Sequence, residues 1–247
     1  MIDDRKNDRQ NVPGNADPAL SGQPGEQSPG HSSGGSKVKQ TAVYAVSVLP
    51  LALAAAVYSR LPSRIPTNWG FDGEVSYGPR ANLWLIAGMA PFLALLFRFL
   101  PSIDPKRRNY LKFQDVYLSF QLFMQVFLLV MTGIIVTESL RPGTIQVSTV
   151  VTAMCGVLFM MIGNMAPKFR QNFFCGFRTP WALSNEVVWN KTHRLGGRLM
   201  FCAGIIGFIG AFMPSDRVKM AMLLLPLLAA SVIPYVMSYV WFRKVTE

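Results

Sequence analysis

Six long apolar segments dominate the pattern of residues along this chain, and polar or turn-rich stretches separate them. The segments cover residues 41–58, 81–97, 116–137, 145–165, 199–214 and 220–242. A helix needs about 20 apolar residues to cross a hydrocarbon core of about 30 Å. The second and fifth segments are short and need their flanks to reach the interface. The pattern predicts an all-α fold, a polytopic membrane bundle of six transmembrane helices.

The first 36 residues are rich in Gly, Pro, Ser, Asn and Asp and contain almost no large apolar side chain. Such a composition buries too little apolar surface to offset the entropy of ordering, so this segment is predicted to be disordered. The predicted organisation is a disordered tail over 1–38, a two-span membrane domain with an outer loop over 39–112, and a four-span membrane domain over 113–247.

Composition and charge agree with a membrane protein. Charged residues make up 15% of the chain, against about 25% in soluble domains. Eighteen of the 24 Lys and Arg residues fall on one side of the predicted spans. Because basic residues concentrate in cytoplasmic connections, both termini are predicted in the cytoplasm of a multi-pass cell-membrane protein. The net charge of +11 is therefore explained by the orientation of the protein in the membrane, and no direct nucleic-acid binding is expected.

The chain shows no catalytic or metal-binding motif, so no catalytic residue, metal or cofactor is predicted. Cys155, Cys175 and Cys202 have no metal-ligand spacing. The spans contain almost no ionisable residue, which counts against an ion pump. Gln121 and Gln125, one helical turn apart, are expected to hydrogen-bond to a neighbouring helix. A small-xxx-small stripe at Ala203, Gly207 and Ala211 predicts close helix packing.

The connection 60–80 has too many turn and aromatic residues for a plain linker. We expect a compact structure on the outer membrane surface. It is either a folded cap or a recognition site for something outside the cytoplasm. The recognition residues would be Pro62, Pro66, Asn68, Trp69, Gly70 and Gly73.

The connection 164–198 predicts a capped helix. Ser184 is a suitable N-cap and Glu186 suits the first turn, while Gly196 and Gly197 are expected to end the helix. The segment is amphipathic and basic, which predicts a helix on the cytoplasmic membrane surface. His193 and Glu186 would share a face, but no nucleophile or third group accompanies them.

These two connections carry a resemblance to a known family. The second resembles the signature of the SdpI family of bacterial immunity proteins, and the first resembles a short membrane domain of unknown function that precedes that signature. The resemblance covers roughly residues 41–245. The matching residues of the second connection, which we take as its functional motif, are Asn164, Asn172, Gly176, Arg178, Thr179, Pro180, Trp181, Glu186, Trp189, His193, Gly196 and Gly197.

The resemblance implies an immunity or signalling membrane protein. Such a protein would meet a secreted peptide toxin through its outer loop, and its basic cytoplasmic loop would contact membrane lipids and recruit a cytoplasmic winged-helix repressor. Two alternatives stay open. A small-solute transporter or channel is supported only by prolines inside the spans, and an integral-membrane enzyme acting on lipid or cell-wall intermediates would work through His193 and Glu186.

Overall fold

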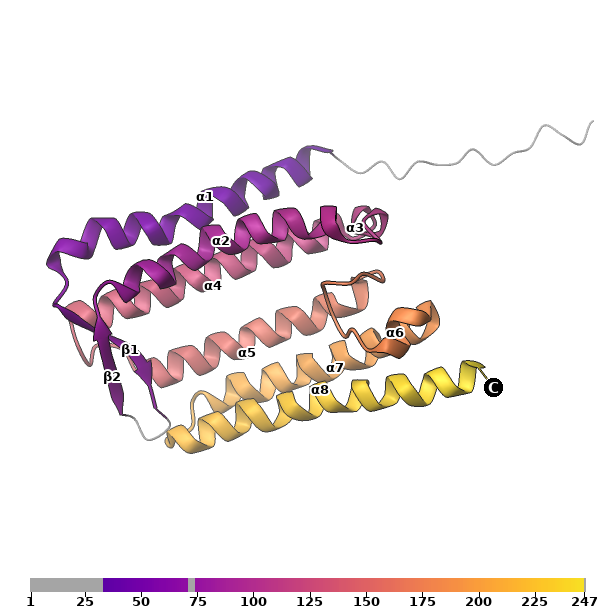
Figure 1. Ribbon diagram of the computed structural model, residues 1–247. Coiled ribbons are helices and arrows are strands. Elements are labelled where there is room, and N and C mark those ends of the chain that lie inside the picture. Colours follow the sequence, from indigo (N-terminus) through magenta and orange to yellow (C-terminus); the bar gives the residue numbers. More distant parts are fainter. Residues whose placement is uncertain (1–32, 71–73, 247) are drawn as a thin grey trace, which may run out of the picture. The chain divides into compact units, whose positions relative to one another are not determined.

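The computed structural model describes residues 33–70 and 74–246, and long helices make up most of this part of the chain (Figure 1). The long helices are α1 (Ser33–Val57), α2 (Asn82–Ile103), α4 (Gln114–Leu140), α5 (Val147–Met165), α7 (Glu186–Gly210) and α8 (Asp216–Thr246). The short helical turns are η1 (Tyr58–Arg60), α3 (Arg108–Leu111), η2 (Ala166–Lys168) and α6 (Pro180–Ser184), and the strands are β1 (Arg64–Trp69) and β2 (Val75–Pro79).

Five of the six predicted spans are helices long and apolar enough to cross a membrane, namely α1, α2, α4, α5 and α8. This is the build of a multi-pass membrane protein. The remaining predicted span, 199–214, lies largely on α7, which does not meet the same criterion because charged residues occupy its first half. α1 begins at Ser33, ahead of the predicted start, and so includes the end of the predicted tail. The rest of that tail lies outside the described residues.

The prediction of a separate surface helix over 184–195 is wrong. α7 runs without a break through Gly196 and Gly197 into the apolar segment. Its N-cap is Asn185 rather than Ser184, because the Asn185 side chain accepts hydrogen bonds from the N–H groups of Val187 and Val188. The predicted first-turn carboxylate, Glu186, is in place.

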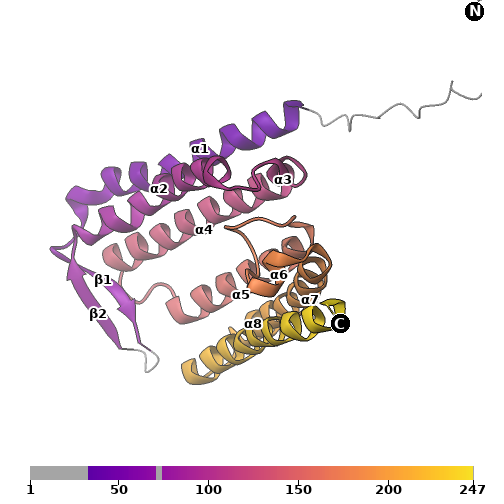
Figure 2. The same ribbon diagram turned by 45° about the vertical axis from the view of Figure 1, so that its right-hand side comes forward.

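The helices pack in two groups of three. α1, α2 and α4 contact one another, α5, α7 and α8 contact one another, and α4 also contacts α5 (Figure 2). The first group crosses the predicted domain boundary at residue 112. The start of α1, the end of α8 and the connections 104–113 and 166–185 lie at one end of the helices, which we call the loop end (Figure 1). The two strands lie at the other end, which we call the hairpin end.

Glycines bring α5 and α7 together at two levels. A Cβ on Gly163 would lie 2.6 Å from the carbonyl oxygen of Gly197, and one on Gly156 would lie 2.8 Å from that of Gly204. Small residues of this kind let two helix backbones approach closely. Gly197 therefore serves packing rather than helix termination. In the predicted stripe, Gly207 faces Leu223 on α8.

The outer connection is a β-hairpin, so the prediction of an all-α fold needs correction to a mostly helical one. β1 and β2 pair antiparallel, with Ile65 opposite Gly78 and an irregularity between Pro66 and Asn68. The Ile65 side chain is fully buried in a core that includes Leu83 of α2. This burial fixes the hairpin against the helices.

The expectation that the glutamines on α4 bond to a neighbouring helix is wrong. Gln125 is completely buried, and neither atom of its amide has a hydrogen-bond partner within the described residues. Gln121 is also buried. A buried amide without a partner is costly, so Gln125 lowers the stability of this part of the helix bundle.

Candidate functional site

The loop-end platform consists of residues 104–113, residues 166–185 and the first half of α7. Asn172 sets the path of its longest connection. This side chain is completely buried, and its Oδ1 accepts hydrogen bonds from the N–H groups of Phe174 (2.9 Å) and Cys175 (2.6 Å). Its Nδ2 donates to the carbonyl of Arg170 at 2.8 Å. One amide thus replaces the backbone partners that an irregular buried segment lacks.

Asp104, which sequence analysis missed, joins the two connections of the platform. Its buried carboxylate accepts hydrogen bonds from the N–H of Lys106 (2.7 Å), the hydroxyl of Tyr110 (3.1 Å) and the N–H of Phe173 (2.8 Å). Burial raises the pKa of Tyr110, as do the neighbouring Cys175 thiol and Asp104. The phenol therefore stays protonated and serves as a donor.

Gln171 makes the second link between the two connections and was also missed. Its Oε1 accepts from Nζ of Lys106 at 2.5 Å, and its backbone carbonyl accepts from Asn109 at 2.7 Å. Its Nε2 donates to the carbonyls of Ala182 (3.0 Å) and Leu183 (2.6 Å) in α6. Neither Asp104 nor Gln171 belongs to a local motif, so only the tertiary contacts reveal them.

His193 anchors the platform from α7. Its Nε2 accepts a hydrogen bond from the N–H of Phe177 at 3.0 Å, so Nδ1 carries the proton and donates to the Trp189 carbonyl at 2.9 Å. The Trp189 ring stacks on the imidazole at 3.9 Å and donates from its own Nε1 to the Phe169 carbonyl. The His193 ring is completely buried and precedes the apolar half of α7. Burial lowers the pKa of His193 to about 4, so the ring is neutral near pH 7.

This geometry removes the acid/base pair considered from sequence. Both ring nitrogens of His193 are used by backbone groups, and Glu186 is exposed at the start of α7. Trp189 and His193 of this helix segment face the interior of the protein. Within the described ranges 33–70 and 74–246, no three His, Cys, Asp or Glu side chains lie close enough together to hold a metal.

Two glycines make room for this anchor. Gly176 has φ of 97°, a left-handed conformation that favours glycine, and a Cβ there would collide with Nε2 of His193. A Cβ on Gly196 would collide with the ring of Phe177. The two glycines therefore let the Phe177 segment close over His193.

The remaining motif residues differ in exposure, and Thr179 is buried. Thr179 is the N-cap of α6 and accepts from the N–H of Ala182 at 3.1 Å, with Pro180 at the first helical position. Trp181 packs against α8, and Arg178 and Asn164 are exposed. The Arg178 guanidinium donates to the Phe173 carbonyl at 2.8 Å.

A cavity of about 430 Å³ lies at the hairpin end, where the hairpin meets the turns before α5 and α8. Three of the predicted recognition residues line it: Pro66, Trp69 and Gly70. Pro62 and Asn68 do not belong to its lining, and Gly73 lies outside the described residues. The hairpin also contributes the side chains of Val75 and Tyr77, of which 36% and 47% are exposed.

The helices contribute charged residues to this cavity that sequence analysis did not single out. Lys219 donates from Nζ to Asp216 (2.9 Å) and Ser148 (3.2 Å), and all three line the cavity. Glu138, which is 7% exposed, accepts from the N–H groups of Gly143 (2.9 Å) and Ile145 (2.6 Å). The charged groups are fixed in place by these bonds, while the hairpin side chains offer apolar surface.

Comparisons with known proteins match both candidate regions. Residues 168–240 match the SdpI/YfhL protein family, and residues 45–90 match the domain of unknown function DUF1648. A curated relative is the immunity protein SdpI of Bacillus subtilis strain 168, which is 22% identical over 188 residues, or 76% of this chain and 88% of that protein. No solved structure matches the chain. The chain thus belongs to the SdpI/YfhL family, with a DUF1648 segment ahead of its SdpI segment, and is a distant homologue of the Bacillus subtilis immunity protein.

Proposed function

We propose that this protein confers immunity to a secreted peptide toxin, or senses one, through the cavity at the hairpin end. The observation that carries the proposal is the placement of apolar and charged groups around one opening. Tyr77 and Val75 offer exposed apolar surface, and Lys219, Asp216 and Glu138 lie beside them. Peptide recognition commonly combines apolar anchors with a few fixed polar groups.

The orientation that this proposal requires places the hairpin end outside the cell. The support is the concentration of Lys and Arg at the loop end, which favours the cytoplasm. Reporter fusions after residues 75, 140 and 216 should read extracytoplasmic, and fusions after 108, 180 and 247 should read cytoplasmic. A cytoplasmic reading at residue 75 would overturn this orientation.

The loop-end platform is then the cytoplasmic surface, where we place lipid contact and recruitment of a repressor. Its exposed basic side chains suit phosphate groups or an acidic protein surface. These side chains include Arg108, Lys112, Arg170, Arg178 and Arg194. The hydrogen bonds that fix the platform support this role, because they hold the exposed side chains on an ordered surface.

The test uses a Bacillus subtilis strain that lacks its own SdpI and is grown beside toxin-producing wild-type cells. Expression of the intact chain should restore survival and preserve the membrane potential of the recipient cells. Tyr77→Ala should lose protection at unchanged membrane abundance, because it removes an apolar anchor from the cavity. Failure of the intact chain to protect at matched abundance would contradict immunity toward that toxin.

Phe212→Ala is the matched control. Phe212 is an aromatic residue near the hairpin end that is 64% exposed and does not line the cavity. This variant should protect as well as the intact chain. Equal losses in both variants would point to a general effect of removing exposed aromatic surface.

A further inference from the structure

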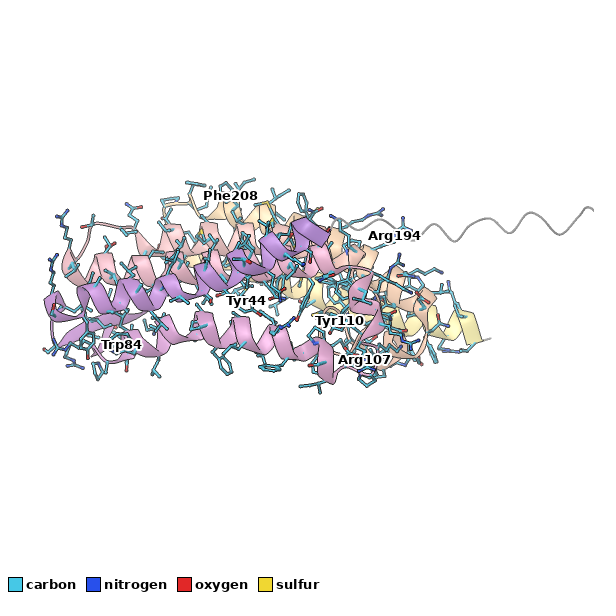
Figure 3. All side chains as sticks on the ribbon, turned by 90° about the horizontal axis from the view of Figure 1, so that it is seen from above. Tyr44, Trp84, Arg107, Tyr110, Arg194 and Phe208 are labelled. Carbon is cyan, nitrogen blue, oxygen red and sulfur yellow. The ribbon has the colours of Figure 1, made fainter. Side chains whose placement is uncertain are left out.

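A second cavity, of about 530 Å³, lies at the loop end of the first helix group. It is bounded by α1, α2, α3 and α4 and is separate from the cavity at the hairpin end. Figure 3 labels three of its lining residues, Tyr44 of α1, Arg107 and Tyr110, which lie toward the end of the helices away from Trp84. None of these three belongs to the motif that defines the platform's family signature.

The walls of this cavity combine polar and apolar side chains. Arg107 and Gln114 lie where α3 and α4 begin, whereas Leu118 lies one turn further into α4. Phe97 lines the cavity from the last two turns of α2. α1, α2 and α4 are candidate membrane spans, so the cavity sits where headgroups give way to hydrocarbon.

Two arginines line the cavity without a carboxylate partner. The guanidinium groups of Arg98 and Arg107 form no hydrogen bond or ion pair with any residue in the described ranges. The nearby carboxylates are already engaged, because Asp104 accepts three hydrogen bonds inside the platform and Asp115 pairs with Lys39 at 3.4 Å. The cavity therefore offers positive charge to an anion from outside the described chain.

A buried amide lines the same cavity. Gln121 is 5% exposed and has no hydrogen-bond partner within the described residues. Its amide N–H suits an ester carbonyl, which is the polar group that a phospholipid carries between its phosphate and its chains.

We propose that this cavity binds one anionic phospholipid. Arg98 and Arg107 hold its phosphate, Gln121 bonds to an ester carbonyl, and an acyl chain lies along Phe97 and Leu118. Basic cavities between membrane helices bind anionic headgroups in this way, and arginine can donate two hydrogen bonds to one phosphate. A soluble peptide fits less well, because the apolar wall belongs to helices that face hydrocarbon. The lipid would fasten α1 to α2 and α4 whether or not the protein binds a toxin.

The test uses the full-length protein in a neutral detergent, with added phosphatidylglycerol or phosphatidylcholine of identical acyl chains. Phosphatidylglycerol should raise the melting temperature more, and native mass spectra should show one tightly retained copy. Arg98→Gln combined with Arg107→Gln should lower that affinity by about thirtyfold, from the worth of two basic side chains near an anionic lipid. Gln121→Leu, which keeps side-chain size, should weaken binding of both lipids.

Arg141→Gln is the matched control, since Arg141 is exposed at the hairpin end and does not line this cavity. It should retain the preference for phosphatidylglycerol. Equal stabilisation by the two lipids would overturn the proposal, because it would show a groove for acyl chains without anion recognition. Glycerol 3-phosphate, tested on the intact protein, separates a lipid from a free phosphate. Stabilisation by it equal to that by phosphatidylglycerol would also overturn the proposal.

Discussion

The N–H of Phe177 donates a hydrogen bond to Nε2 of His193 at 3.0 Å, which fastens the connection 166–185 to a buried ring on α7. The two rings also meet edge to face, with centroids 5.6 Å apart. Because Nε2 accepts this bond, His193 acts as a neutral structural acceptor. The loop-end platform is therefore held from the inside, and its exposed basic residues are free to meet partners.

His193→Ala should destabilise the protein by about 2–4 kcal/mol, because it leaves the Phe177 N–H unpaired and opens a cavity beside Trp189. Thermal unfolding of the purified protein in detergent measures this. Arg194→Ala, an exposed neighbour on the same helix, should change stability by no more than about 0.5 kcal/mol. Similar losses in the two variants would contradict the anchoring role of the imidazole.

Stability should fall as the pH drops below about 6.5, the ordinary pKa of histidine. The pKa of His193 is lowered to about 4 by burial, so between these values the unfolded chain binds more protons than the folded one. Its contribution to stability is full above pH 6.5 and is lost as the pH falls toward 4. Melting temperatures between pH 8 and 4.5 should show a smaller decline for His193→Gln than for wild type. Parallel curves would contradict this assignment.

Gly163→Ala should destabilise the protein by roughly 1–3 kcal/mol, because the added methyl group would clash with the Gly197 carbonyl and push α5 away from α7. Gly133 of α4 provides a matched control, since a Cβ there has no neighbour within 4 Å. Gly133→Ala should leave the melting temperature unchanged or raise it, because alanine favours a helix over glycine. A loss at both positions would indicate that close helix approach is not the cause.

Asp104→Ala should loosen the platform by leaving the Tyr110 hydroxyl and the Phe173 N–H without their acceptor. The expected cost is about 1–3 kcal/mol, and limited proteolysis should cut the connection 166–185 faster. Asp115→Ala removes an exposed carboxylate that pairs with Lys39 and should change the cutting rate little. Unchanged proteolysis of the Asp104 variant would show that the two connections hold together without it.

Arg178 and Trp181 belong to one predicted motif, but Arg178→Lys and Trp181→Ala should have different effects. Arg178 is exposed, so Arg178→Lys should reduce toxin protection or repressor recruitment at normal membrane abundance, because lysine lacks the planar fork. Trp181 packs on Tyr235 and Tyr239, with ring centroids at 5.7 and 5.1 Å. Trp181→Ala should therefore lower abundance and melting temperature together with function. Immunoblots of membranes beside a survival assay separate the effects, and wild-type survival in both variants would contradict a role for either residue.

The local sequence pattern was sufficient to predict the long apolar helices. The length and apolarity of segments such as 116–137 and 220–242 are properties of the chain itself, because each helix satisfies its own backbone in hydrocarbon. The first-turn position of Glu186 likewise follows from its neighbours. The hairpin was harder to predict from sequence. Turn residues in 60–80 predict a compact structure, but the pairing of the strands depends on burial of Ile65 against α2, which no local pattern contains.

Tertiary contacts decided the rest. Gly196 and Gly197 carry a local signal for helix termination, yet α7 continues because Gly197 packs on Gly163 of another helix. His193 beside basic residues predicts a surface position, but its environment is set by Phe177, which lies sixteen residues away in the chain. Asp104 acquires its role only when residues 69 positions apart meet. Sequence alone thus determined which segments are apolar enough to cross a membrane, through their transfer free energy. The partners of the buried polar side chains were decided by long-range packing.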